Sequence, residues 1–140
     1  MEHRLTTPVT REMLAPLRAG DAVLLSGTVY TARDAAHARL CDLLRRGGEP
    51  PFELSGSAVY YVGPTPARPG TPIGAAGPTT SGRMDSFSPT LIERGQLLMI
   101  GKGKRSDAVK DAIVRCGAST PAIIPRRGST WISCPEIKSK

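Results

Sequence analysis

The stretch Gly77-Pro78-Thr79-Thr80-Ser81-Gly82-Arg83-Met84-Asp85 places three adjacent hydroxyls, two glycines and one guanidinium in a single turn. Glycines let the backbone approach a ligand closely, and hydroxyls and free N–H groups offer hydrogen-bond donors. Arg83 can bind a carboxylate through two parallel hydrogen bonds. These residue types predict an anion-binding turn. A connection that only reverses the chain direction uses the same residue types about as often.

Strand and helix signals surround this turn and predict an α/β domain. The apolar run Ile73-Gly74-Ala75-Ala76 precedes the turn, and Ser88-Pro89 is typical of a helix start. We therefore expect the turn at the carboxyl end of a strand, where α/β sheets collect their ligands. The sequence pattern by itself leaves α/β and α+β open.

Further segments alternate in the same way along the chain. Apolar or β-branched runs predict strands, and capped amphipathic segments predict helices. The expected strands are 22–30, 58–62 and 97–100, and the expected helices are 10–14, 34–46 with Asp34 as its cap, and 106–117 with Ser106 as cap and Gly117 as stop. Five polar residues fall on connections after strands, where one carboxylate-rich ligand could meet them: Arg33, Thr79, Thr80, Arg83 and Lys102.

Four motifs in order resemble one family. They are Thr28-Val29-Tyr30-Thr31-Ala32-Arg33-Asp34-Ala35-Ala36-His37, Val59-Tyr60-Tyr61-Val62-Gly63-Pro64-Thr65-Pro66, the turn itself, and Ile100-Gly101-Lys102-Gly103 with Arg105-Ser106-Asp107. Together they resemble the β subunit, or C-terminal domain, of class I iron-sulfur fumarases and tartrate dehydratases. The resemblance covers about residues 5–117. Within the turn, the motif Ser81-Gly82-Arg83-Met84-Asp85 resembles that of the fumarases more than that of the tartrate dehydratases.

This resemblance implies a swivelling β/β/α domain and an enzyme subunit, a hydro-lyase acting on a C4 dicarboxylate, with fumarate and malate favoured over tartrate. It implies a hetero-oligomer in which an α subunit holds a 4Fe-4S cluster. In this chain, Arg33, Arg83 and Lys102 would bind carboxylates and Thr80 would donate a hydrogen bond. Thr79 matches the residue that the family uses as the base at the substrate's carbon-bound proton.

Cysteine spacing gives no reason to place a metal in this chain. Cys41, Cys116 and Cys134 are too far apart for a C-x-x-C pair, and three is a poor number for a disulfide framework. Cys41 and Cys116 lie on apolar helical faces, where cysteine is more often a small buried hydrophobe than a ligand. We expect no metal ligand and no bound cofactor in this chain alone.

Three other polar residues near the motifs have structural interpretations. His37 lies one turn into a helix and could donate a proton, but hydrogen bonding to local loops is the more frequent role of such a residue. Asp34 and Asp85 are expected to be helix caps or partners of Arg33 and Arg83 before they are catalysts.

The sequence departs from the family pattern after Gly117. We therefore expect a domain of residues 1–117 and a divergent basic tail of residues 118–140, with a sheet that lacks its C-terminal part. Pro121, Pro125 and Pro135 are expected to interrupt any regular element there. An inactive remnant, or a non-enzymatic dicarboxylate-binding module, is the alternative to an active enzyme.

Charge and hydropathy restrict the remaining classes. The formal net charge is +7, of which residues 118–140 supply +3; the remaining +4 fits a protein that attracts a dianion, or a basic solvated surface. An RNA-binding protein is a third hypothesis, but the chain has only one Trp, three Tyr and two Phe, and none alternates with basic residues as in single-strand binders. No apolar run approaches the roughly 20 residues that span a bilayer, and no secretory signal is recognisable. We expect a cytoplasmic protein that binds neither nucleic acid nor membrane.

Overall fold

The computed structural model describes residues 2–18, 20–63, 66, 68–70 and 77–120, together with the backbone of residues 122–126 and 129–133. In the described parts of the chain the strands are β1 (Glu2–Thr6), β2 (Ala22–Ser26), β3 (Tyr30–Thr31), β4 (Ala58–Tyr60), β5 (Leu98–Ile100), β6 (Ala122–Arg126) and β7 (Ser129–Ser133). The helices are α1 (Arg11–Leu14), α2 (Asp34–Arg45), the 3₁₀ helix η1 (Ser81–Met84), α3 (Ser88–Glu93) and α4 (Asp107–Cys116).

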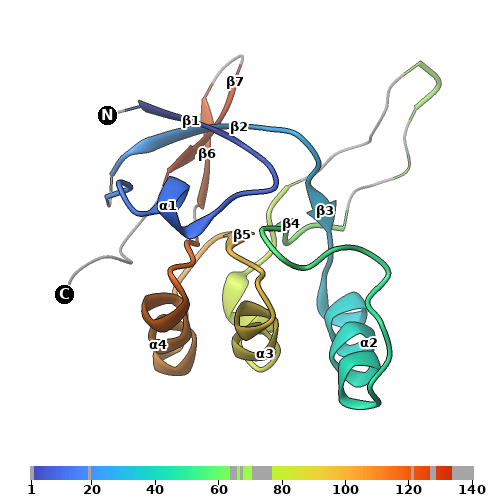
Figure 1. The fold of residues 1–140 in the computed structure, drawn as a ribbon. Helices are drawn as coiled ribbons and strands as arrows, with labels where there is room; N and C mark the ends of the chain where they lie inside the picture. The colour runs from blue at the N-terminus through green and yellow to red at the C-terminus, as the bar shows by residue number, and fades with distance from the viewer. Residues whose placement is uncertain are drawn as a thin grey trace.

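A short parallel sheet, β3-β4-β5, carries the helices. Val59 of β4 pairs with Tyr30 of β3, and Ala58 pairs with Leu98 of β5. Every residue of β5 is buried, as expected for a parallel strand covered on both faces. Helices α2, α3 and α4 lie in a row on one side of this sheet (Figure 1). Because all three strands run the same way, their carboxyl ends meet at one edge.

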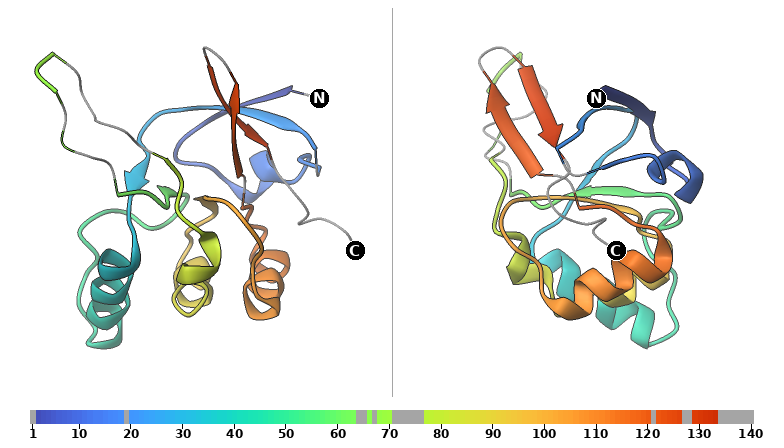
Figure 2. Two further views of the ribbon diagram at one scale, coloured as in Figure 1. Left: turned by 180° about the vertical axis from the view of Figure 1, so that it is seen from behind. Right: turned by 90° about the vertical axis from the view of Figure 1, so that its left-hand side faces the viewer.

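A second sheet has the order β1-β2-β7-β6 and lies on the other side of the short sheet from the helices (Figure 2). In it, β1 and β2 are parallel, and β7 is antiparallel to both β2 and β6. The two sheets and the helices confirm a mixed α/β fold. None of the helices in the described residues is long and apolar enough to cross a bilayer.

The strand predicted over residues 22–30 is wrong as a single element, because the chain changes sheets within it. β2 ends at Ser26 and β3 begins at Tyr30 in the other sheet. Gly27 lies between them with φ of 101°, in the left-handed region that glycine tolerates. A Cβ at Gly27 would lie 3.1 Å from the backbone nitrogen of Thr7. The chain can therefore pass between the two sheets here only because glycine has no side chain.

Helix ends follow the capping residues, with one correction. Ser106 accepts a hydrogen bond from the Val109 N–H at 3.4 Å, and Gly117 closes α4 in the left-handed conformation. The prediction that Asp34 caps α2 is wrong: Arg33 occupies the N-cap position, and no side-chain cap bond is made there. Asp34 is the first helical residue, where its negative charge still suits the positive end of the helix dipole.

Among the residues whose burial the structure describes, the core forms two apolar clusters. The larger one joins both sheets to α4, and the smaller one packs α2 against α3. Cys41 is buried in the smaller cluster, and Cys116 is a half-buried residue at the margin of the larger one. Both cysteines therefore pack as small apolar side chains, as predicted. Cys134 lies outside the described residues, as do Ile73-Gly74-Ala75-Ala76.

Residues beyond Thr120 include a β-hairpin, which overturns the expectation that prolines interrupt every regular element there. β6 and β7 pair over five residue pairs, from Ala122 with Ser133 to Arg126 with Ser129. Pro125 lies within β6, the edge strand of its sheet, which is where a strand tolerates a missing N–H group. Pro121 and Pro135 lie outside the described residues.

Candidate functional site

The carboxyl edge of the β3-β4-β5 sheet gathers the five residues that the sequence analysis singled out. Arg33 follows β3, and Lys102 follows β5. Residues 79–83, called here the 79–83 turn, lie against the ends of β4 and β5. The Thr79 N–H donates to the Tyr61 carbonyl at 2.8 Å, and the Ser81 N–H donates to the Lys102 carbonyl at 2.8 Å. Thr80 forms an isolated parallel bridge with Lys102.

Arg33 lies over the backbone just after β4. A Cβ at Gly63 would lie 2.7 Å from both Cδ and Nη1 of Arg33. Only a glycine therefore leaves room for the guanidinium in this place. Arg33 is exposed, so its charge remains available to a ligand.

Arg83 is held by a carboxylate from the neighbouring helix. Its Nη2 lies 2.9 Å from Oδ2 of Asp34, and the two side chains are 53% and 43% exposed. Asp34 was expected to cap its helix or to pair with Arg33, and it pairs with Arg83 instead. The other carboxylate oxygen of Asp34 is buried and has no hydrogen-bond partner among the described residues. Asp34 thus ties the 79–83 turn to the start of α2.

The remaining three predicted residues present polar groups at the same edge. Thr79 is half-buried, whereas Thr80 and Lys102 are exposed. Within the described parts of the chain, their hydroxyl and ammonium groups form no hydrogen bond or ion pair. These groups are therefore free to contact a ligand at this edge.

The close approach of the 79–83 turn to β5 depends on Gly101, which the sequence analysis did not single out as a site residue. A Cβ at Gly101 would collide with Oγ of the buried Ser81 and would lie 3.0 Å from Cδ2 of Tyr61. A glycine directly after a buried strand was the available signal in the sequence.

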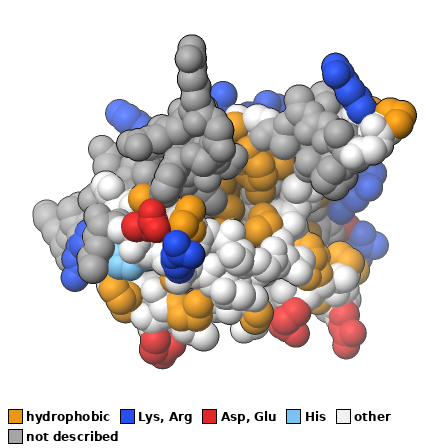
Figure 3. Space-filling model, turned by 90° about the horizontal axis from the view of Figure 1, so that it is seen from above, with side chains coloured by type: hydrophobic (Ala, Val, Ile, Leu, Met, Phe, Trp, Pro, Cys, Tyr) orange, Lys and Arg blue, Asp and Glu red, His pale blue; other side chains and the backbone are white. Residues whose placement is uncertain are grey.

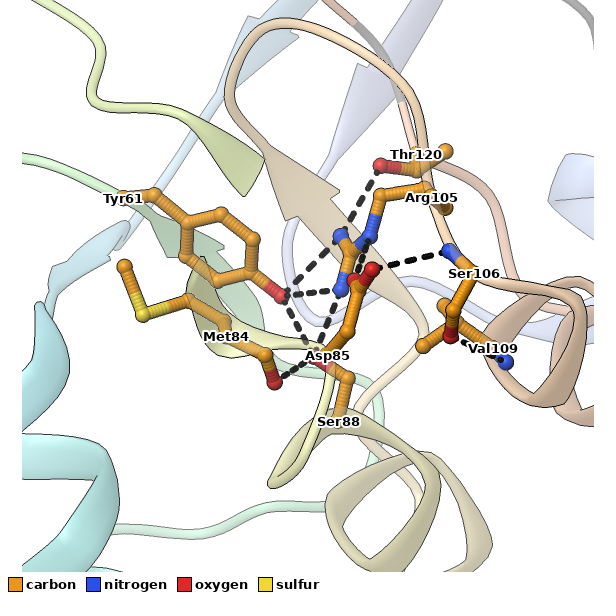
Figure 4. A network of polar contacts seen from close by, with 8 residues as sticks. All are labelled: Tyr61, Met84, Asp85, Ser88, Arg105, Ser106, Val109 and Thr120. Atoms are coloured by element: carbon orange, nitrogen blue, oxygen red, sulfur yellow. Dashed lines mark hydrogen bonds and ion pairs between the residues drawn. The ribbon is translucent and has the colours of Figure 1, made fainter. Parts of the chain in front are cut away.

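Behind the turn lies a buried polar network centred on Arg105 (Figure 4). Its Nε donates to Oδ1 of Asp85 at 2.8 Å, and its Nη2 donates to Oγ of Ser88 at 2.6 Å. Both Nη1 and Nη2 lie 3.3 Å from the Tyr61 hydroxyl, and Nη1 lies 3.3 Å from Oγ1 of Thr120. Asp85 therefore partners Arg105 and not Arg83. Arg105 belongs to one of the four motifs, but nothing in the sequence predicts its burial, because a single arginine in a loop is usually solvated.

His37 has the structural role that was expected. It is 1% exposed, and its Nδ1 lies 2.8 Å from the Arg33 carbonyl. Burial lowers the pKa of His37, which keeps the imidazole neutral. In that state Nδ1–H donates to the carbonyl, and Nε2 is a buried acceptor without a partner among the described residues.

The described residues do not fit an iron-sulfur cluster. They contain no group of three or more His, Cys, Asp or Glu side chains that could hold a metal ion. Cys41 lies in the α2–α3 cluster with its Sγ 3.8 Å from the Phe87 carbonyl, and burial raises the pKa of its thiol. Cys116 lies on α4, in a different part of the core.

Positive charge is scattered over the face seen in Figure 3. Lys and Arg side chains lie mainly around its rim, separated by neutral and hydrophobic side chains. The described Lys and Arg side chains on this face therefore do not form the continuous basic strip typical of a surface that binds a nucleic-acid backbone.

Comparisons with known proteins agree with the motifs. The family model described as Fumarase C-terminus matches residues 2–120. The L(+)-tartrate dehydratase subunit beta of Escherichia coli K12 is 42% identical over 106 residues, which cover 74% of this chain and 51% of that protein. The anaerobic class I fumarate hydratase of the same organism is 40% identical over 111 residues, covering 76% of this chain and 20% of that protein.

A third relative, fumarate hydratase 2 of Leishmania major, is 37% identical over 138 residues, covering 91% of this chain and 24% of that protein. The identities do not separate fumarate hydratases from tartrate dehydratases. The chain spans about half the length of the tartrate dehydratase subunits that it matches. From the motifs and the matched residues, the chain belongs to the Fumarase C-terminus family.

Proposed function

We propose that this chain is the β-type component of an iron-sulfur hydro-lyase that adds water to, or removes it from, a C4 dicarboxylate. Fumarate and malate are the favoured pair, and tartrate is the second choice. The observation that carries the proposal is the convergence of Arg33, the 79–83 turn and Lys102 at one sheet edge. The tartrate dehydratase and fumarate hydratase relatives support the same reaction class.

In this proposal three cations bind the two carboxylates of the substrate. Arg33 and Arg83 can each form paired, charge-assisted hydrogen bonds, and Lys102 adds a point charge. The Asp34 carboxylate orients Arg83 through one nitrogen, which leaves the other donors of that guanidinium for the substrate. Thr80 donates a hydrogen bond from the same turn.

Thr79 is proposed to handle the proton on the substrate carbon. A threonine hydroxyl is a weak base on its own and needs a neighbouring base to activate it. No described residue of this chain forms a hydrogen bond with the Thr79 hydroxyl. We therefore infer that the activating group comes from a partner subunit.

The 4Fe-4S cluster also belongs to that partner in our proposal. The described cysteines lie in separate parts of the core: Cys41 is buried in the cluster of α2 and α3, and Cys116 is half-buried against the larger cluster. The contribution of this chain is then to bind the substrate carboxylates, orient the substrate and handle one proton. We infer a hetero-oligomer with an α subunit, located in the cytoplasm, and we assign the two-sheet architecture to the swivelling β/β/α fold.

The test is co-expression with a candidate α subunit, followed by anaerobic assays of fumarate hydration and L-tartrate dehydration. Lys102→Ala is expected to raise KM at least tenfold, because it removes a charged contact to substrate. Lys110→Ala, which removes an exposed lysine on α4, is the matched control and should leave KM within twofold. Binding of dicarboxylates without turnover by the assembled complex would favour the non-enzymatic module, and equal behaviour of the two variants would refute the proposed site.

A further inference from the structure

Arg105 is an unusual arginine because it is almost fully buried beside the candidate site. Its side chain is 2% exposed and forms an ion pair with Asp85, which is 18% exposed. A buried guanidinium is costly unless its donors find acceptors. Here Nε, Nη1 and Nη2 all have acceptors within 3.3 Å.

The partners of Arg105 bracket the 79–83 turn at both ends. Before the turn, the Tyr61 hydroxyl accepts from Arg105, while the carbonyl of the same Tyr61 accepts the Thr79 N–H at 2.8 Å. After the turn, one oxygen of Asp85 accepts from Arg105, and the other accepts the Ser106 N–H at 2.8 Å. The Arg105 side chain thus links Tyr61, which anchors the start of the turn, to Asp85, which follows the turn by two residues.

The same network also fixes the elements on which the turn rests. Ser88, at the start of α3, accepts from Arg105 at 2.6 Å and donates to the Met84 carbonyl of η1 at 3.0 Å. Figure 4 shows the side chains of Tyr61, Asp85, Ser88 and Thr120 gathered around the Arg105 guanidinium. The strands β4 and β5 have only three residues each, so few ladder hydrogen bonds are available to hold their ends.

We propose that Arg105 is a positioning residue that holds the 79–83 turn in its ligand-binding arrangement. This inference rests on the proposed function of the turn. Arg105 acts through Tyr61 and Asp85, and it is not itself a contact of the substrate. A lysine could keep the charge opposite Asp85, but its single ammonium group cannot reproduce the planar fork that reaches four acceptors.

The test compares Arg105→Lys with Tyr61→Phe, which removes one hydroxyl and keeps the ring. Arg115→Gln is the matched control, because Arg115 also binds two carboxylates but is 51% exposed on α4. In the assembled complex, we expect Arg105→Lys to raise KM for fumarate or malate at least tenfold and Tyr61→Phe to raise it severalfold. Arg115→Gln should stay within twofold of the wild type. A purely structural role would reduce the active fraction and leave KM unchanged.

A second measurement needs no activity. Hydrogen exchange of the Thr79, Ser81 and Arg83 amides should accelerate at least tenfold in Arg105→Lys, while the amides of α2 keep their wild-type rates. KM and exchange rates within twofold of the wild type would overturn the inference. If the wild-type complex neither binds nor converts a dicarboxylate, the proposed function fails, and the exchange rates alone then decide whether Arg105 holds the turn.

Discussion

Gly63→Ala tests the place of Arg33 without touching any charged group. The added Cβ would lie 2.7 Å from Cδ and Nη1 of Arg33, whereas carbon atoms in contact lie about 3.5–4.0 Å apart. The Arg33 side chain must therefore move by about 0.8 Å or more. A shift of about 1 Å in a substrate-positioning group can cost about a hundredfold in rate.

The expected loss can also be worked out from hydrogen bonding. One hydrogen bond from a charged donor contributes about 1.5–3 kcal/mol, which corresponds to about ten- to a hundredfold in KM. The free energy of unfolding should change by less than about 1 kcal/mol, since Arg33 is exposed and can move aside. The variant should therefore separate binding from stability.

The assay is substrate titration of the assembled complex, paired with urea unfolding of the purified chain. Lys110→Ala, which removes an exposed side chain on α4 and leaves residues 77–85 unchanged, is the control. A Gly63→Ala complex with wild-type KM, beside an Arg33→Ala complex with a strongly raised KM, would show that Arg33 does not bind substrate from this position. The reasoning from Gly63 would then be wrong.

Three further predictions concern the proton, the ion pair and pH. Thr79→Ala should lower kcat more than it raises KM; an effect on KM alone would reassign Thr79 to binding. Arg83→Ala should raise KM by about tenfold or more, from the loss of a charge-assisted contact, and unchanged steady-state kinetics would exclude Arg83 from the site. Because burial lowers the pKa of His37, the unfolded chain binds a proton that the folded chain rejects as pH falls below about 6.5. The free energy of unfolding should therefore be highest above that pH and should fall below it by up to about 1.4 kcal/mol per pH unit. Urea unfolding from pH 5 to 8 should show this fall in the wild type and not in His37→Gln. The same dependence on pH in both proteins would contradict a buried, neutral His37.

Local signals in the sequence were enough to locate the helices α1, α2 and α4 and the short strands β4 and β5. Ser106 and Gly117 mark the ends of α4 because cap chemistry acts within a few residues. The meeting of Arg33, Lys102 and the 79–83 turn also followed from sequence, because residues after parallel strands share one edge of a sheet.

Features that depend on tertiary approach could not be predicted in this way. The run 22–30 is mostly apolar or β-branched, and its division between two sheets goes with the close approach of Gly27 to Thr7, which is distant in the sequence. The ion pairs Arg83–Asp34 and Arg105–Asp85 join segments that are distant in the sequence. Neither ion pair leaves a periodic pattern in the sequence. The arginine partners predicted for Asp34 and Asp85 were therefore wrong.

The exposed cations at the carboxyl edge act on an anion before any contact forms. Lys102 and Lys104 are exposed and follow β5, so their field extends into solvent over about one Debye length, about 8 Å at physiological ionic strength. A dianion would arrive faster for this reason, by about tenfold or more at low salt, and added salt would slow its arrival. Arg33, seated over Gly63, and Arg83, held by Asp34, would instead govern how long the anion stays. The rate of arrival would thus depend on the two lysines, and the residence time of the anion on the two arginines.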